Sequence, residues 1–173
     1  EAKLVFIGYG PKETELKTQV KNLGLEEKIL FVGGQSRSDL SRYYATADIF
    51  IGPSIVAEGG DTEGQPAAFI EAMASKTAII ASDVGGIKDM VKNEETGLLI
   101  HQKDPKAITK AITTLCKDSV LKQQLEQNAK EHIIKFFRWQ AVAEQYMVIY
   151  ENIDKILEQS TPSLPPPKLS ALP

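Results

Sequence analysis

The sequence has 173 residues, 42% hydrophobic and 25% charged, which is the composition of a globular domain long enough to bury a core of its own. Its net charge of −3 and its pI near 5.5 argue against binding to nucleic acid or to anionic membranes, both of which require a basic face. The single Cys116 excludes an internal disulfide, and we expect it on the buried side of a helix. His101 and His132 lie far apart, and no His/Cys cluster has metal-ligand spacing, so we expect no metal site.

Two further features concern membranes and export. No apolar run approaches the ~18 residues of a membrane-spanning helix, and no signal peptide opens the chain. The sequence begins at Glu1, without Met, directly in an expected strand. We interpret it as a segment of a longer protein, which we expect to be cytoplasmic.

Short apolar runs alternate with segments of helical periodicity from the N-terminus onward. The runs contain no polar alternation, so both faces of the strands should be covered, as is typical of a parallel sheet. Helical spacing follows the first two runs, over residues 16–23 and 40–47. The predicted strands are residues 4–7, 29–32, 49–51, 78–81 and 98–100. The pattern predicts an α/β fold, a doubly wound, Rossmann-like parallel sheet with helices on both faces.

The C-terminal half is predicted to be mainly helical. We expect Asp104 to cap a helix that Pro105 begins, and Asp118 to cap the next. A last helix is predicted near residues 140–158, with apolar residues at heptad-like spacing. Residues 160–173 are rich in Pro and are expected to form a disordered tail, with a ligand for an SH3-type domain as the alternative. The expected domain is therefore residues 1–159.

Glycine-bearing turns follow the first two predicted strands. Gly8-Tyr9-Gly10-Pro11 stands where a dinucleotide fingerprint would, but Glu13 replaces its third glycine and would repel a pyrophosphate. A tight turn with Pro11 beginning a helix is therefore favoured over an NAD site. Gly33-Gly34-Gln35 leaves room for a flat base against the main chain, and a plain loop leading to a helix cap is the alternative.

The stretch EGQPAAFIEAMAS, residues 63–75, is the most informative part of the chain. Glu63 lies in a turn that opens a helix, and Glu71 lies eight positions later inside that helix. Pro66 suits the first helical position, and behind it the N–H groups of Ala67 and Ala68 can face an anion. The helix face expected to pack on the sheet is Ala67, Ile70, Met73 and Ala74. Two carboxylates beside a helix N-terminus suit a ligand that is anionic at one point and hydroxylated elsewhere, such as a nucleotide-sugar.

The glycine-rich loop before this helix allows a second interpretation. Asp61-Thr62-Glu63 is an acid-x-acid element of the kind that binds Mn²⁺ or Mg²⁺. The helix that follows directly, with another Glu inside it, favours a metal-free site instead. Asp61 is then a turn residue, and residues 53–62 form a mobile flap. Gly85-Gly86, after the fourth predicted strand, is explained by close packing of a helix on a strand.

Several motifs resemble, in the same order, the C-terminal donor-binding domain of the family-4 retaining glycosyltransferases, which have the GT-B fold. That family carries Glu, Gly, a variable residue, Gly or Pro and then Glu-Ala-Met-Ala, as in residues 63–75 here. The other motifs are VFIGYGP at 5–11, FVGG at 31–34, ADIFIGPS at 47–54, DVGG at 83–86 and ETGLLI at 95–100. The resemblance covers roughly residues 4–150.

The resemblance implies a role for each part of the signature. It implies that Glu71 bonds the ribose hydroxyls, that Glu63 is catalytic through a hydroxyl of the transferred sugar, and that the 33–35 loop holds the base. The implied contacts to sugar and phosphate are Gly64, Gln65, Pro66, Ala67 and Ala68. The implied donor is a UDP- or GDP-sugar bound without metal or cofactor. The implied reaction transfers a hexosyl group to a saccharide or lipid acceptor.

Two features depart from the family pattern. The family's Gly-Arg and Lys-Gly element, which supplies cations for the diphosphate, belongs to a first strand and loop that this sequence lacks. Gln65 stands where the family often has an aromatic or aliphatic residue. We expect this segment to be inactive alone and to need the missing N-terminal acceptor domain of the same protein. Whether that domain attaches the protein to a membrane is left open. The alternatives are a nucleotide-sugar-binding module without catalysis and a sugar-nucleotide epimerase.

Overall fold

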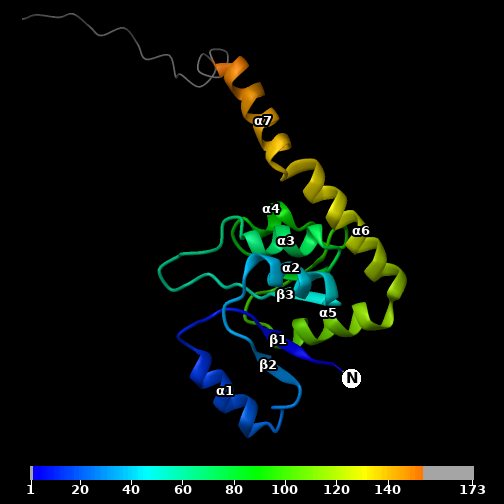
Figure 1. Cartoon of the computed structure of the whole chain (residues 1–173). Helices are drawn as coiled ribbons and strands as arrows, with labels where there is room; N and C mark the ends of the chain where they lie inside the picture. The colour runs from blue at the N-terminus through cyan, green and yellow to red at the C-terminus, as the bar shows by residue number, and fades with distance from the viewer. Residues whose placement is uncertain (1, 154–173) are drawn as a thin grey trace, which may run out of the picture.

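The computed structural model describes residues 2–153, in which strands and helices alternate before a helical C-terminal part (Figure 1). The first half contains β1 (Leu4–Phe6), α1 (Glu13–Asn22), β2 (Ile29–Phe31), α2 (Arg37–Thr46), β3 (Ile49–Gly52) and α3 (Ala67–Ala74). The second half contains β4 (Ala78–Ser82), α4 (Ile87–Met90), β5 (Leu98–Ile100), α5 (Pro105–Lys117), α6 (Ser119–Phe136) and α7 (Trp139–Glu151). Each predicted strand is therefore present within about one residue of its expected bounds.

The strands are all parallel but belong to two sheets. β1 pairs with β2, and β3, β4 and β5 form a three-stranded sheet with β4 in the middle. The predicted parallel α/β fold is confirmed, with its strands divided in this way. Within residues 2–153 no strand pair joins β1 to β3, so each of these strands has one unpaired edge.

Strand β4 organises the core because its residues alternate between two apolar clusters. Ile79 and Ala81 pack with buried residues of α3 and α4, while Ala78 and Ile80 pack with buried residues of α5 and α6. All four are fully buried, and full burial of an Ile side chain contributes about 1.5–3 kcal/mol. The prediction of helices on both faces is thus confirmed for the larger sheet.

The local signals that begin α5 and α6 act as predicted. Asp104 Oδ1 accepts the N–H groups of Lys106 and Ala107 at 3.0 Å each, and Asp118 Oδ1 accepts the N–H of Leu121 at 2.9 Å. The expectation for Cys116 was wrong, because its side chain is exposed. The inward face of α5 carries Ala111 and Leu115, and the residue after Leu115 lies outside that face.

Helix α7 projects away from the rest of the domain (Figure 1). Its heptad-like apolar residues do not form a buried face here, since Tyr146 and Ile149 are 57% and 47% exposed and only Ala141 is buried. The helix ends at Glu151, and the predicted continuation to residue 158 and the Pro-rich tail 160–173 lie outside the described residues.

Candidate functional site

The loops that carry the predicted site residues follow the carboxyl ends of the strands. Gly33-Gly34-Gln35 follows β2, the long segment 53–66 follows β3, and Gly85-Gly86 follows β4. In open parallel sheets ligands bind at this edge. The loops that carry the predicted site residues therefore lie where a parallel sheet binds its ligand.

The segment between β3 and α3 is a long excursion with a compact turn at its tip (Figure 1). Within it the N–H of Ala57 donates to the carbonyl of Asp61 at 2.8 Å, and the N–H of Gly60 donates to the carbonyl of Ala57 at 2.9 Å. The N–H of Val56 donates to Gln102 Oε1, after β5, at 2.9 Å. Asp61 is thus a turn residue, and the base of the loop is fixed while its tip is exposed.

The main chain around Glu63 is held against the Gly85-Gly86 turn. The N–H of Gly86 donates to the carbonyl of Glu63 at 3.0 Å. Gly85 has φ +52°, and a Cβ on either glycine would collide with main-chain oxygens of Glu63 or Gly64. The explanation by helix–strand packing was therefore wrong. These residues are glycines because the Glu63 loop lies directly on them, which leaves the Glu63 side chain exposed.

Helix α3 begins one residue later than predicted, with Pro66 as its N-cap at φ −68° and ψ 125°. No side chain caps this end, so the N–H groups of Ala67 and Ala68 have no capping acceptor within the described chain. The helix dipole makes such an end favourable for an anion. The positive end of α3 begins four residues after Glu63 in the sequence.

The buried face of α3 differs in part from the predicted one, since Met73 is buried and Ile70 packs on the core as expected. Phe69 and Met73 are buried together with Ala72, whereas Ala67 and Ala74 are exposed. The phase is set by Phe69, whose ring packs edge-on against Phe50 at 5.1 Å and lies where a Cβ of Gly52 would be. This rotation leaves Glu71 half-buried, on the side of α3 that faces α2.

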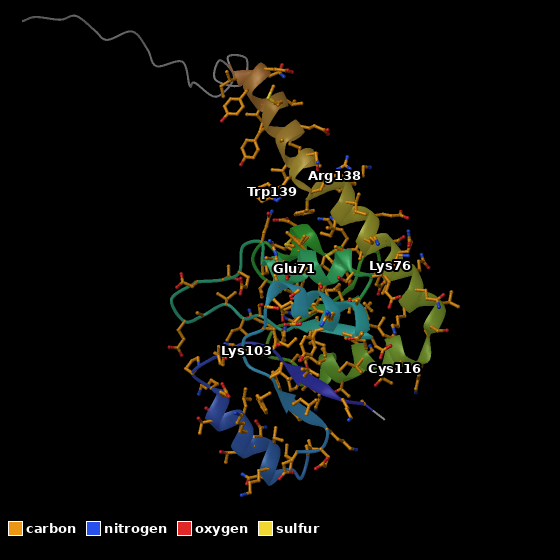
Figure 2. All side chains as sticks on the ribbon, in the orientation of Figure 1. Glu71, Lys76, Lys103, Cys116, Arg138 and Trp139 are labelled. Carbon is orange, nitrogen blue, oxygen red and sulfur yellow. The ribbon has the colours of Figure 1, made fainter. Side chains whose placement is uncertain are left out.

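Glu71 has a neighbour that the sequence did not indicate, Tyr44 of α2. Burial, and then the charge and hydrogen bonding of the Glu71 carboxylate, raise the pKa of the Tyr44 hydroxyl. The Tyr44 ring packs edge-on against Phe50 at 6.0 Å, and its main-chain oxygen accepts the Thr77 hydroxyl at 2.7 Å. The spacing of Tyr44 within α2 indicated only a core-facing residue, so no local signal could have linked it to Glu71. Figure 2 labels Glu71 at α3, above α2.

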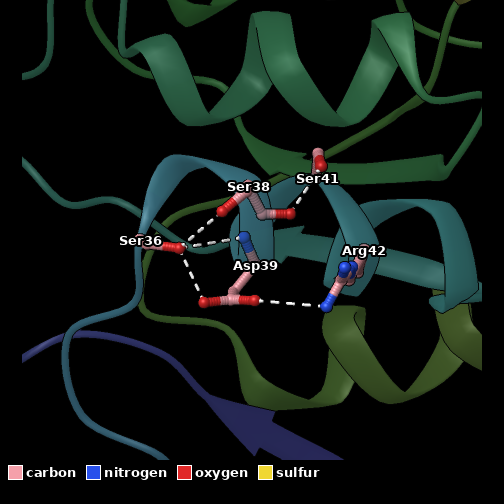
Figure 3. Close-up of polar contacts among 5 residues, drawn as sticks. All are labelled: Ser36, Ser38, Asp39, Ser41 and Arg42. Atoms are coloured by element: carbon pink, nitrogen blue, oxygen red, sulfur yellow. Dashed lines mark hydrogen bonds and ion pairs between the residues drawn. The ribbon is translucent and has the colours of Figure 1, made fainter.

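The 33–35 loop is shaped by hydrogen bonds at both ends. Gly33 has φ +67° and its carbonyl accepts the N–H of Gly8 at 2.8 Å. Gln35 Nε2 donates to the carbonyl of Val32 at 2.6 Å, so this side chain bonds its own loop. Next, the Ser36 hydroxyl caps α2 by accepting the N–H of Asp39 at 3.2 Å, in a polar cluster that includes Arg42 (Figure 3). Ser36 thus caps α2, as in the plain-loop alternative, and base binding by residues 33–35 stays a prediction.

Two hollows of the described chain are lined by residues other than Glu63 and Glu71. One of about 840 Å³ lies open along α1, and one of about 160 Å³ lies between the carboxyl ends of β4 and β5 and the start of α5. Of the two predicted carboxylates, Glu63 is exposed and Glu71 is half-buried. Within residues 2–153, no cluster of three or more His, Cys, Asp and Glu side chains could hold a metal, and no helix is long and apolar enough to cross a membrane.

Comparison with known proteins connects this arrangement with one family. The profile of the family Glycosyl transferases group 1 matches residues 1–132. The chain is 29% identical over 153 residues to N-acetyl-alpha-D-glucosaminyl L-malate synthase of Bacillus anthracis, covering 88% of this chain and 38% of that protein. It therefore spans less than two fifths of that relative's length.

Solved structures give the same assignment. Sucrose-phosphate synthase from Thermosynechococcus elongatus superposes with a TM-score of 0.75 at 30% identity, over 89% of this chain and 39% of that one. HepE from Anabaena, solved in complex with UDP, superposes with a TM-score of 0.71 at 20% identity, over 91% of this chain and 41% of that one, and so supports the fold alone. The fold is that of GT-B glycosyltransferases. Because the family profile covers most of the sequence, the chain belongs to the glycosyl transferases group 1 family.

Proposed function

We propose that this chain is the donor-binding part of a retaining glycosyltransferase that binds a nucleotide-sugar of the UDP or GDP type without a metal ion. The observation that carries the proposal is the anchoring of Glu63 by Gly86 immediately before the uncapped N-terminus of α3. The helix end suits a diphosphate, and carboxylates on either side of it suit hydroxyl groups. In HepE the bound nucleotide is UDP.

Each carboxylate has its own part of the donor in this proposal. Glu71 accepts the ribose hydroxyls and lies beside Tyr44, whose phenol is a hydrogen-bond donor for the carboxylate. Glu63, exposed at the loop before the helix, accepts a hydroxyl of the transferred sugar. The Gly64-to-Ala68 main chain faces sugar and phosphate, where negative charge develops as the bond to the diphosphate breaks.

In this proposal the rest of the active site is supplied from outside this sequence. The Glu63 side chain is exposed, and a transferase must surround the reacting bond and position an acceptor. We propose that a saccharide or lipid acceptor is held by an N-terminal domain of the same protein. We also propose that a strand from that longer protein pairs with the unpaired edges of β1 and β3 and so joins the two sheets.

The proposal is tested by titrating the 173-residue chain with UDP, GDP and ADP, with and without EDTA, and following main-chain NMR signals. Since the cationic element for the diphosphate is absent, we expect a Kd near or above roughly 0.1–1 mM for the preferred nucleotide, insensitive to EDTA. Shifts should concentrate at residues 33–35 and 63–71. Binding that EDTA abolishes would contradict the metal-free site, and no binding of any nucleotide would contradict the donor-binding role.

A further inference from the structure

Tyr9 is an exposed aromatic residue that lies against the predicted base loop. Tyr9 is 82% exposed, which is unusual for a residue with a large ring. Its ring atoms nevertheless occupy the space beside both loop glycines. A Cβ on Gly33 would lie 3.0 Å from Tyr9 Cε1, and one on Gly34 would lie 2.8 Å from Tyr9 Cε2. One side of the ring thus covers the glycine pair while the remainder faces solvent.

The main chain fixes this relationship. Gly8, immediately before Tyr9, has φ +117° and donates its N–H to the carbonyl of Gly33 at 2.8 Å. The two loops follow β1 and β2, which are paired neighbours in the same sheet. Tyr9 therefore stays beside the glycine pair even if its side chain turns about χ1, because the hydrogen bond holds the Cα position.

Tyr9 does not have the environment of a structural residue. The aromatic pairs and cation–π contacts of the described residues do not include it, although they include Phe6 and Phe31 of the adjacent strands. No hydrogen bond from its hydroxyl occurs among the described residues. A ring held beside two glycines, and otherwise unpacked, can turn away and cover a planar group placed on that loop.

We propose that Tyr9 is the stacking residue for the base of the donor nucleotide. In the bound state the ring leaves the glycine pair and packs on the outer face of the base, so that the base lies between Tyr9 and the Gly33-Gly34 main chain. This inference rests on the proposed nucleotide-sugar site and assigns it a residue that recognises the base. Every base has a π-face, so Tyr9 contributes affinity for nucleotides generally, and the loop main chain supplies the choice among bases.

The test compares the 173-residue chain with its Tyr9→Ala and Tyr9→Phe variants. Each is titrated with UDP, GDP and ADP by NMR, and NOEs are sought between the residue 9 ring and the base protons. We expect Tyr9→Phe to keep the parent affinity within about twofold and Tyr9→Ala to lose roughly tenfold or more, as for removal of other base-stacking aromatics. The parent and Tyr9→Phe should show ring-to-base NOEs.

The outcomes separate this inference from the proposed function. If the parent chain binds a nucleotide and Tyr9→Ala binds it equally well, or no ring-to-base NOE occurs, the role of Tyr9 is refuted and the donor site stands. If the parent chain binds no nucleotide, the donor site itself is refuted. Because Tyr9 is exposed, the thermal midpoint of Tyr9→Ala should match that of the parent within about 2 °C. A large drop in that midpoint would instead identify Tyr9 as a structural residue.

Discussion

The N–H of Gly86 donates to the carbonyl of Glu63 at 3.0 Å, across a separation of 23 residues in the sequence. This bond fixes the approach to α3 independently of the loop tip, which turns back on itself between Ala57 and Asp61. The exposed Glu63 side chain is thereby presented from a fixed main chain. The glycines at 85 and 86 serve that contact, since any side chain there meets the main chain of the Glu63 loop.

Replacing Gly86 by Ala should displace the Glu63 loop. The new Cβ would collide with the Gly64 carbonyl oxygen and lie 2.9 Å from its carbon, and forcing a methyl group into such a space costs about 1–3 kcal/mol. The matched control is Gly59→Ala on the same loop, where a Cβ meets nothing within 4 Å. Urea unfolding measures both variants. Equal stability of Gly86→Ala and Gly59→Ala would show that the contact does not constrain the loop.

The pairing of Tyr44 with Glu71 predicts a dependence on alkaline pH. Burial first, and then Glu71, raise the pKa of Tyr44 in the folded chain, so above the ordinary Tyr pKa the unfolded chain loses this proton before the folded chain does. The stability that comes from this difference in Tyr44 pKa is present below about pH 10 and is lost as the pH rises through the folded-state pKa. Tyr44→Phe should therefore lose less stability than the parent between about pH 9 and pH 11. Urea denaturation across this pH range measures the free energy of unfolding of each variant, and Tyr150→Phe, at an exposed tyrosine, is the control. Parallel curves for Tyr44→Phe and the parent would contradict the pairing.

The caps of α5 and α6 should each contribute to stability. Asp104→Ala and Asp118→Ala remove side-chain acceptors of three main-chain N–H groups in total, and loss of a helix N-cap typically costs about 1 kcal/mol. Lys110→Ala, on the exposed side of α5, is the control and should change stability by less than ~0.5 kcal/mol. Thermal unfolding compares the stability of the two cap variants with that of Lys110→Ala. Cap variants no less stable than Lys110→Ala would mean that water replaces the carboxylates without loss.

The strands and helix caps could be predicted from the sequence because their signals are local. The apolar run 78–81 marks β4, and an Asp before a helical pattern marks each cap. The exposure of Cys116 was missed because a neighbouring residue, Leu115, carries the buried face of α5. When the buried face of a helix is predicted one position off, a residue expected to be buried is found to be exposed.

The contacts of the candidate site could not be predicted in the same way. The phase of α3 depends on Phe69 meeting Gly52 and Phe50 of another element. The neighbour of Glu71 is Tyr44, 27 positions earlier in the sequence, and the partner of the Glu63 carbonyl is Gly86. The sequence motifs supplied the residues of the candidate site. Only the folded chain shows which of them touch.

The 173-residue chain alone should not transfer sugar. In the proposed function the acceptor is held by a domain outside this chain, and sugar transfer requires the reacting bond to be surrounded and water to be excluded. We expect no release of UDP or GDP from UDP- or GDP-sugars above that of a Glu71→Ala control, in the presence of saccharide or lipid acceptors. A coupled assay for the released nucleoside diphosphate measures this. Turnover by the chain that Glu71→Ala abolishes would show that it carries a complete active site.

The central claim is that Glu71 and Glu63 hold different parts of the donor, and it is tested most directly by the affinity of the chain for free nucleoside diphosphate in two variants. Glu71→Ala should weaken binding by about tenfold or more, because a charged hydrogen bond of at least ~1.5 kcal/mol to the ribose is lost. Glu63→Gln should leave that affinity nearly unchanged, since its contacts concern the sugar. Equal losses of free nucleotide affinity in both variants, or no loss in Glu71→Ala, would contradict the account.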